Sequence, residues 1–294
     1  MKKAVVTGAG GFIGGALTKA LLEKGYTVYG VDLNGENLTP LCNYNLFVPV
    51  EIDLKKDNLS EHIKDTVDVL YYMSWGGSMG AEDRYNVPLQ TNNISVAASV
   101  CKDSVKFCRK FIFASSSYEN MKSIETNSFI IDIYGIAKRA AGDICASISN
   151  RNSMDYNKVI LTNTFGVGDR SKKAVNTIVT AMINNFPLKL VEGNNPNDWV
   201  YIDDTVKGLI LCGENGKPFR EYYIGNSNIT TFKEKILEMG IVLCPERQFT
   251  FGEMSENTYI DYTKLKDEIQ DGFECKADFK ESILKTAKWI KENL

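Results

Sequence analysis

The start of the chain combines a short apolar run, a cluster of glycines and a helical pattern, and this order constrains the fold more than any other feature. In VVTGAGGFIGGAL (5–17), Gly8, Gly11 and Gly14 lie between a predicted strand and a predicted helix. Glycine permits a tight turn and lets the backbone approach a bound group without interference from a Cβ atom. The helix N-terminus adds free N–H groups and the positive end of a dipole. This arrangement predicts a pyrophosphate site, the alternative being a tight glycine turn without a ligand.

Further apolar runs alternate with helical patterns through the first half of the chain. The runs that predict strands are 2–8, 27–33, 46–54, 67–74, 110–116 and 158–166. The patterns that predict helices are 12–25, a stretch within 86–107, and 133–150. Continuous apolar strands separated by helices are typical of a parallel sheet covered on both faces. The predicted fold class is therefore α/β, a doubly wound parallel sheet of the Rossmann type.

The regular alternation ends near residue 168. The later elements that we expect are a helix at 173–185, a strand at 188–193, a helix at 231–239 and a terminal helix at 278–293. We therefore predict a Rossmann domain over 1–168 and a smaller mixed α/β substrate lobe over 169–294. Residues 200–216 are expected to return to the larger domain.

Charge and composition argue against several classes of function. A net charge of −3 and a pI near 5.5 do not suit binding to nucleic acid, which needs a basic surface. No run of about 18 apolar residues predicts a transmembrane helix, and the apolar run at the N-terminus is too short for a signal peptide. Seven scattered cysteines without a Cys-x-x-Cys pair, and His62 as the single histidine, predict neither a metal site nor a Ser-His-Asp hydrolase. We expect a cytoplasmic protein with reduced cysteines.

An acidic residue after the second predicted strand indicates which dinucleotide the glycine loop would hold. Asp32 lies at the end of TVYGVDL (27–33). A carboxylate there can accept hydrogen bonds from both ribose hydroxyls of an adenosine, and it repels a 2′-phosphate. The sequence therefore favours NAD(H) over NADP(H).

The glycine spacing Gly-x-x-Gly-x-x-Gly also carries a family resemblance. TGAGGFIG (7–14) resembles the fingerprint of the extended short-chain dehydrogenase/reductase superfamily of nucleotide-sugar epimerases, dehydratases and reductases, and the resemblance runs nearly the whole length of the chain. It implies contacts to the adenine from Asp53 with Leu54, and a further cofactor contact from Asn93. The cofactor-binding residues that we expect are Gly8, Gly11, Phe12, Ile13, Gly14, Asp32, Asp53, Leu54, Met73, Ser74, Asn93, Tyr134 and Lys138.

A tyrosine and a lysine four residues apart are the candidate catalytic pair. A helix would place Tyr134 and Lys138 on one face, although such a pair taken alone is an ordinary surface contact. A tyrosine pKa of about 10 is too high for a base near neutral pH, and an ammonium and an oxidised nicotinamide both lower it. The resemblance implies that Tyr134 exchanges a proton with the sugar, that Lys138 also holds the nicotinamide ribose, and that Ser116 orients the substrate. Ser115 and Ser117 are the alternative serines.

The resemblance further implies a nucleoside-diphosphate sugar as the substrate. The substrate contacts that we expect are Ser116, Ser117 and Asn163, of which Asn163 matches the family segment that touches the sugar diphosphate. Asn197 stands where the family usually has an arginine, so the chain departs from the family at a common phosphate contact.

Three other expectations concern the second half of the chain and its oligomeric state. PLKLVEG (187–193) matches the family strand that flanks the nucleotide base. Asp203 and Asp204 are expected to cap the helix that follows them. The family implies a homodimer through the helices near 86–107 and 133–150.

Two departures from the family pattern bear on the reaction type. The 4,6-dehydratases place an Asp-Glu pair directly after the catalytic serine or threonine, whereas this chain has Ser117 and Tyr118 there and Glu119 one step further. The segment YYMSWGGSMG replaces the usual His-x-Ala-Ala. Together with Glu119, it is similar to a branch that contains 4-keto-sugar reductases of the abequose-synthase kind and related epimerases. For Met73 and Trp75, core packing is the alternative interpretation.

We therefore predict an NAD-dependent enzyme that moves a hydride at C4 of a nucleotide sugar, as a 4-epimerase or a 4-keto-6-deoxysugar reductase, with Tyr134 as acid/base. Asp32 favours a retained NAD and epimerisation, whereas the SWGGS segment favours reduction. The alternatives are a 4,6-dehydratase and a non-catalytic NAD-binding sensor or scaffold. The presence of both Tyr134 and Lys138 argues against the sensor.

Overall fold

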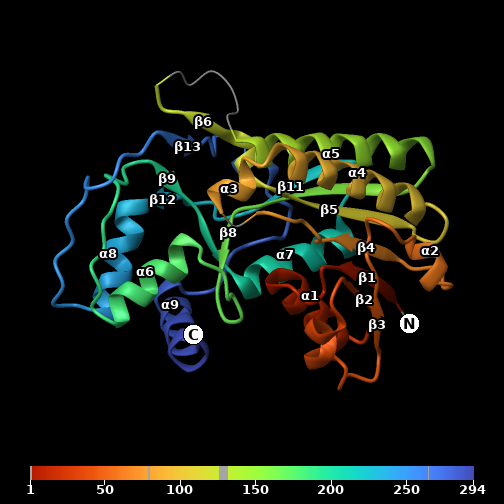
Figure 1. The fold of residues 1–294 in the computed structure, drawn as a ribbon, viewed down its shortest axis with the longest axis horizontal. Coiled ribbons are helices and arrows are strands. Elements are labelled where there is room, and N and C mark those ends of the chain that lie inside the picture. The colour runs from red at the N-terminus through yellow and green to blue at the C-terminus, as the bar shows by residue number, and fades with distance from the viewer. Residues whose placement is uncertain (1, 79, 126–131, 264) are drawn as a thin grey trace.

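A parallel sheet forms the centre of the computed structural model, which describes residues 2–78, 80–125, 132–263 and 265–294 (Figure 1). Within these residues the sheet has seven strands in the order β11-β7-β5-β4-β1-β2-β3. The strands are β1 (Lys3–Thr7), β2 (Thr27–Asp32), β3 (Phe47–Glu51), β4 (Val69–Tyr72), β5 (Lys110–Ser116), β7 (Asp155–Leu161) and β11 (Arg220–Ile224). Because β1 pairs with both β2 and β4, the winding direction reverses beside β1. The predicted doubly wound α/β fold is confirmed.

Helices cover both faces of the sheet. In Figure 1, α1 (Phe12–Glu23) and α7 (Ile202–Asn215) lie below it, and α4 (Val87–Ser104) and α5 (Ile133–Arg151) lie above it. Each of the two helices above the sheet has a side-chain cap at its N-terminus. Asn86 caps α4 and Asp132 caps α5, and each side chain accepts a hydrogen bond from a backbone N–H of the first turn. Two short helices, α2 (Leu59–His62) and α3 (Ala81–Arg84), and the 3₁₀ turns η1 (Gly35–Leu41), η2 (Ser117–Asn120) and η3 (Lys266–Glu268) connect the larger elements.

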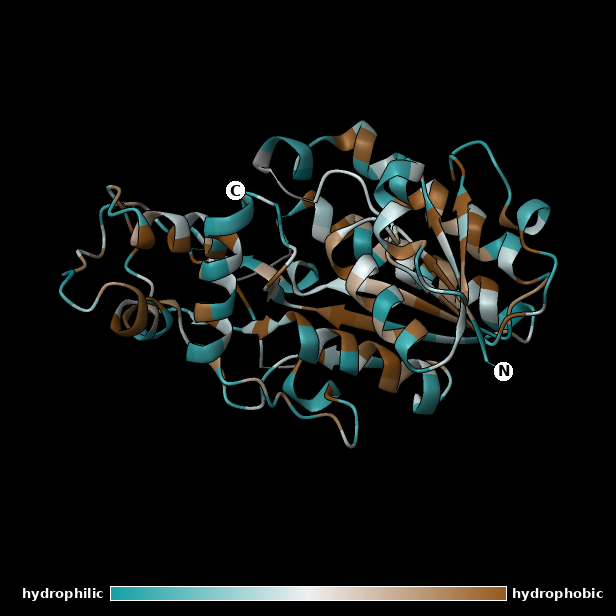
Figure 2. Ribbon diagram, turned by 90° about the horizontal axis from the view of Figure 1, so that it is seen from below, coloured by the Kyte–Doolittle hydropathy of each residue, from teal (hydrophilic) through white to brown (hydrophobic). Residues whose placement is uncertain are grey.

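Two apolar layers hold this arrangement together, one on each face of the sheet. Neighbouring strand residues contribute to opposite layers, as Val6 and Val5 do, because successive side chains of a strand point to opposite faces. Figure 2 shows the result, with apolar residues concentrated in the sheet and on the inward sides of the helices.

The remaining elements form a smaller lobe at the left of Figure 1. It contains α6 (Ala174–Ile183), α8 (Phe232–Leu243) and α9 (Phe279–Asn293). Its strands pair in twos: β8 (Asn163–Phe165) with β10 (Trp199–Tyr201), and β9 (Pro196–Asn197) with β12 (Thr230–Thr231). A third pair, β6 (Met121–Ser123) with β13 (Thr258–Ile260), lies above the smaller lobe in Figure 1.

Two predicted strands differ from the structure. No strand forms over the predicted range 188–193, and the chain is irregular there until β9. The predicted strand 158–166 is divided at Thr162, whose hydroxyl donates to the Asp198 carbonyl at 2.9 Å. The part before Thr162 is β7 of the central sheet, and the part after it is β8 of the smaller lobe.

Residues 200–216, expected to return to the larger domain, form most of β10 and the whole of α7, which packs against α1. The domain boundary itself stays a prediction. No helix in the described ranges has the length and apolar character needed to cross a membrane.

Candidate active site

The glycine loop is closely packed between β1 and α1. Gly8 has φ of +68°, in the region that favours glycine, and a Cβ atom there would lie 3.3 Å from the Ser74 backbone. A Cβ at Gly14 would lie 2.0 Å from the Gly8 carbonyl oxygen, so only glycine fits. Gly11 is the N-cap of α1, which exposes the first N–H groups of the helix. These glycines, with Phe12 and Ile13, line a cavity of about 700 Å³, the first cavity.

Asp32 lies at the end of β2 and holds the glycine loop. Its carboxylate accepts hydrogen bonds from the backbone N–H of Gly10 at 3.0 Å and of Asn34 at 3.2 Å. It borders a second cavity of about 320 Å³. The other predicted cofactor residues that line this second cavity are Gly8, Asp53, Leu54, Ser74 and Asn93.

Ser116, Tyr134 and Lys138 meet in the first cavity. Ser116 is the last residue of β5, while Tyr134 and Lys138 lie in the first two turns of α5. The start of α5 is fixed by Asp132, which accepts a hydrogen bond from the Gly135 N–H at 2.9 Å. Gly135 allows the helix to lie against η2, since a Cβ there would be 2.2 Å from the Tyr118 carbonyl oxygen.

Burial dominates the electrostatics of this pair. It raises the pKa of Tyr134 above its usual range, and a hydrogen bond with Ser116 acts in the opposite direction. Burial lowers the pKa of Lys138 to about 7, while the Glu119 carboxylate raises it. Lys138 Nζ donates to the Ala114 carbonyl at 2.8 Å. The phenol is therefore protonated at neutral pH, and it needs additional positive charge nearby to act as a base.

The other two serines and Glu119 take no comparable position. Ser115 also lines the first cavity, but its hydroxyl donates to Glu119 at 2.8 Å. Glu119 is 4% exposed and pairs with Lys158 at 3.2 Å, and burial raises its pKa. Ser117, predicted as a substrate contact, is 1% exposed and is not among the residues that line the cavity. Ser116 is thus the serine that the fold brings to Tyr134.

Three residues without a predicted site role surround Tyr134. The Trp75 ring lies 6.2 Å from the Tyr134 ring, and the Tyr118 ring lies 5.9 Å from it on an edge-to-face contact. The Arg84 guanidinium lies 4.6 Å from the centre of the Tyr118 ring and 3.3 Å from the Asp132 carboxylate. Arg84, Trp75 and Tyr118 all line the first cavity. No sequence motif indicates a role for Arg84. For Trp75, the only signal in the sequence is that it lies in the SWGGS segment, where the chain departs from the family pattern.

Cationic residues also line the first cavity. Asn163 lines it, and its amide donates to Asn197 Oδ1 at 3.0 Å. Asn197 therefore contacts a predicted substrate residue, although it is not itself among the lining residues. Arg170, Lys172 and Lys173, from the loop between β8 and α6, line the same cavity, as does Asp169, which pairs with Lys173 at 3.8 Å. No sequence motif marks these cations.

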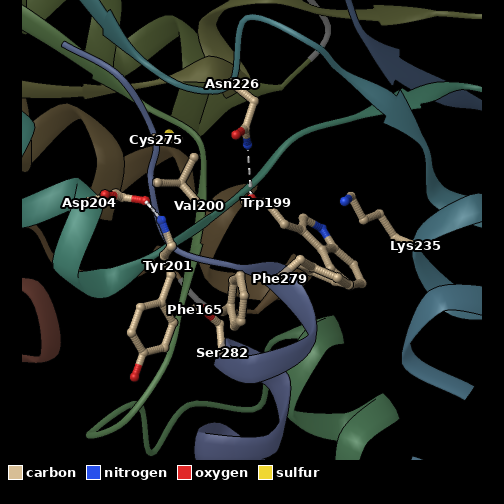
Figure 3. Close-up of a pocket in the computed structure, with 11 residues that line it drawn as sticks. Phe165, Trp199, Val200, Tyr201, Asp204, Asn226, Lys235, Cys275, Phe279 and Ser282 are labelled. Atoms are coloured by element: carbon tan, nitrogen blue, oxygen red, sulfur yellow. Dashed lines mark hydrogen bonds between the residues drawn. The ribbon is translucent and has the colours of Figure 1, made fainter. Parts of the chain in front are cut away.

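Asp204 stabilises the smaller lobe instead of capping its helix. Its carboxylate accepts hydrogen bonds from the backbone N–H of Lys276 at 2.9 Å and of Ala277 at 2.8 Å. The N-cap of α7 is Tyr201, without a side-chain hydrogen bond, so the predicted capping role is wrong. Figure 3 shows Asp204 beside a cavity of about 40 Å³ that holds no more than a few water molecules.

Comparison with known proteins identifies a matching family. Residues 4–225 match the family model described as the NAD dependent epimerase/dehydratase family. UDP-glucuronate 4-epimerase 1 of Arabidopsis thaliana is 24% identical over 331 aligned positions, covering 97% of this chain and 76% of that protein. CDP-abequose synthase of Yersinia pseudotuberculosis is 26% identical over 216 positions, covering 72% of this chain and 74% of that protein.

Solved structures share the fold. UDP-glucuronic acid 4-epimerase from Bacillus cereus in complex with NAD superposes with a TM-score of 0.81 at 23% identity, covering 99% of both chains. UDP-N-acetylglucosamine 4-epimerase from Methanobrevibacter ruminantium superposes with a TM-score of 0.82 at 22% identity, covering 100% of this chain and 99% of that one.

Proposed function

This chain belongs to the NAD dependent epimerase/dehydratase family, and on that basis we propose that it is an NAD-dependent nucleotide-sugar 4-epimerase. The observation that carries the proposal is the meeting of Ser116, Tyr134 and Lys138 in the cavity that the glycine loop also lines. The relatives named as epimerases support the same reaction class. The description of the family as NAD dependent agrees with the cofactor that Asp32 predicts.

The residues present fit NAD. The first and second cavities meet at Gly8, so a dinucleotide could extend from Asp32 and Asp53 past the glycine loop to Tyr134. The Asp32 carboxylate suits ribose hydroxyls and would repel the additional phosphate of NADP. When bound, NAD supplies a nicotinamide ring that can accept a hydride from a sugar carbon and return it.

The residues of the chain supply the proton chemistry. In this proposal Tyr134, once ionised, would accept the proton of the C4 hydroxyl and would return it to the sugar oxygen at the end of the reaction. Burial raises the pKa of the phenol. Positive charge from the Lys138 ammonium and from a bound oxidised nicotinamide would lower it. Ser116 holds the reacting sugar oxygen beside Tyr134.

One observation favours a second candidate, reduction of a 4-keto sugar. CDP-abequose synthases are among the relatives, in agreement with the branch that the SWGGS segment indicates. Dehydratases are also among the relatives, but dehydration has less support here. Glu119, the nearest carboxylate after the serine, is held by Ser115 and Lys158 and does not line the cavity.

The proposed substrate is a nucleoside-diphosphate sugar, and Arg170, Lys172 and Lys173 support it because a diphosphate needs cationic partners. We also propose a homodimer through α4 and α5, supported by the exposed apolar side chains of Ile136 and Ile144 on α5. A cytoplasmic location is the last part of the proposal, and cysteines that form no disulfide support it.

The test combines NAD with nucleoside-diphosphate hexoses, and NADH with nucleoside-diphosphate 4-keto-6-deoxyhexoses, and reads the products by mass spectrometry and NMR. An epimerase gives a product of equal mass with an inverted C4 and leaves the cofactor unchanged. Loss of NADH together with a product that has gained two hydrogens would instead establish the reductase. Binding of NAD without turnover of any substrate would overturn both candidate activities and favour a sensor. Tyr134→Phe, which should strongly lower turnover, is the control for either activity.

A further inference from the structure

We propose that Trp75 is a positioning residue for the catalytic pair, holding the Lys138 ammonium on the face of its indole ring beside Tyr134. The inference rests on the proposed catalytic role of Tyr134 and Lys138. Trp75 belongs to the segment that stands in place of the family's usual His-x-Ala-Ala.

The contact geometry is that of a cation–π interaction. Lys138 Nζ lies 4.1 Å from the centre of the Trp75 ring. The same indole meets the Tyr134 ring edge-to-face, at 6.2 Å and an interplanar angle of 80°. Phe113 also lies near both groups, with its ring 6.4 Å from the Trp75 ring and 5.4 Å from Lys138 Nζ, so the ammonium is closer to Trp75 than to Phe113. One indole therefore touches both members of the pair, and tryptophan is the aromatic side chain that binds cations best.

A hydrogen-bonded loop fixes the orientation of the indole. Trp75 Nε1 donates to the side-chain oxygen of Gln90 at 2.9 Å. The Gln90 amide donates in turn to the carbonyls of Gly77 and Asp83, both at 2.9 Å, and Gln90 is 1% exposed. Such a fully bonded buried glutamine has one orientation, so the ring plane beneath Lys138 is determined before any ligand binds.

The position of Trp75 links the two cavities. Among the described residues, Trp75 and Gly8 line both the first cavity and the second. Lys138 uses one of its three donors on the Ala114 carbonyl. The ring supports the ammonium from one side without using a donor, which leaves N–H groups for a ribose or a sugar hydroxyl.

No charged or titratable group described around Lys138 replaces Trp75 as the contact that stabilises the ammonium. Glu119 from η2 raises the pKa of Lys138 at a distance, but its carboxylate is already paired with Lys158 on β7. On α5 itself, Tyr134 is a protonated phenol in the free protein, because burial raises its pKa. The remaining neighbours act on Tyr134: they are Tyr118 on η2, Asp132 before α5 and Arg84 on α3. Burial lowers the pKa of Lys138, and the π face opposes that effect.

The test measures the ionisation of Lys138 directly, with and without NAD. Lysine labelled with ¹³C at the ε carbon is incorporated, the Lys138 signal is assigned by its absence in Lys138→Met, and its midpoint is followed by NMR against pH. Trp75→Leu should lower the midpoint by about one pH unit, the equivalent of a desolvated cation–π contact. Trp75→Phe keeps a weaker π face and should lower it less.

Trp289→Leu is the control for loss of a tryptophan, because Trp289 lies on α9, away from the pair. An unchanged midpoint in a folded Trp75→Leu protein would overturn the proposal. If Trp75→Leu does not fold, Trp75→Phe decides: a lowered midpoint supports the proposal and an unchanged one overturns it. No sugar substrate is needed, so the result is independent of whether the proposed epimerase activity is found.

Discussion

Replacing Lys138 by methionine should stabilise the protein at neutral pH, since Lys138 is a buried ammonium that the fold holds at an energetic disadvantage. Burial lowers its pKa from 10.5 to about 7. One pKa unit corresponds to about 1.4 kcal/mol, so the charged lysine destabilises the folded state by on the order of 4 kcal/mol. Methionine removes the charge and also the hydrogen bond to Ala114, which is worth about 1 kcal/mol. The expected net gain is roughly 3 kcal/mol near pH 7.

The sign of this effect depends on pH in a way that identifies its cause. Between the folded pKa near 7 and the unfolded pKa of about 10.4, the unfolded chain binds the lysine proton more strongly. The wild-type free energy of unfolding therefore gains about 1.4 kcal/mol per pH unit from this group across that range, and Lys138→Met lacks this gain. The advantage of the variant should shrink as pH rises and should be reversed near pH 10.

Urea unfolding of both proteins at several pH values between about 6 and 10 provides the measurement. Lys102→Met is the matched control, because it removes an exposed lysine of α4 and no buried charge. A stability difference that does not change with pH, or a variant that is less stable at every pH, would refute the reasoning.

Four further changes have expected outcomes. Tyr134→Phe should lower turnover of whichever nucleotide sugar the proposed assay identifies by about 10²- to 10⁴-fold and leave NAD affinity, measured by calorimetry, little changed; equal loss of both would contradict an acid/base role. Gly14→Ala should abolish NAD binding or folding, as followed by calorimetry and circular dichroism, because its Cβ would lie 2.0 Å from the Gly8 oxygen. Asp32→Ala should reduce the preference for NAD over NADP in a binding assay, and an unaltered preference would remove Asp32 from the ribose site. Asp204→Ala should lower the free energy of unfolding by about 1–3 kcal/mol, since two backbone N–H groups lose their acceptor; full stability in urea would contradict this.

Local sequence predicted most of the fold. The helix predicted at 278–293 is α9 (Phe279–Asn293), and the strand predicted at 27–33 is β2 (Thr27–Asp32). Such elements follow from side-chain periodicity over consecutive residues. The errors arose where distant contacts decide. Thr162 divides a continuous apolar run because its hydroxyl bonds to Asp198, and the run at 188–193 has no strand partner.

Sequence alone also determined the chemistry that the chain can carry. The glycine spacing, Asp32, and the Tyr134–Lys138 interval on one helix are short-range features, and each has a direct physical meaning in the residues themselves. The fold brings these groups to the same two cavities.

Only the tertiary structure decided the environment of that chemistry. Ser116 rather than Ser117 faces Tyr134, Glu119 is paired with Lys158, and Trp75 lies beneath Lys138. These contacts join segments that are tens of residues apart, and their distances depend on how β4, β5 and α5 pack together. The ionisation of a buried phenol or ammonium depends on burial and on charges contributed by every neighbouring element, so no local pattern contains it.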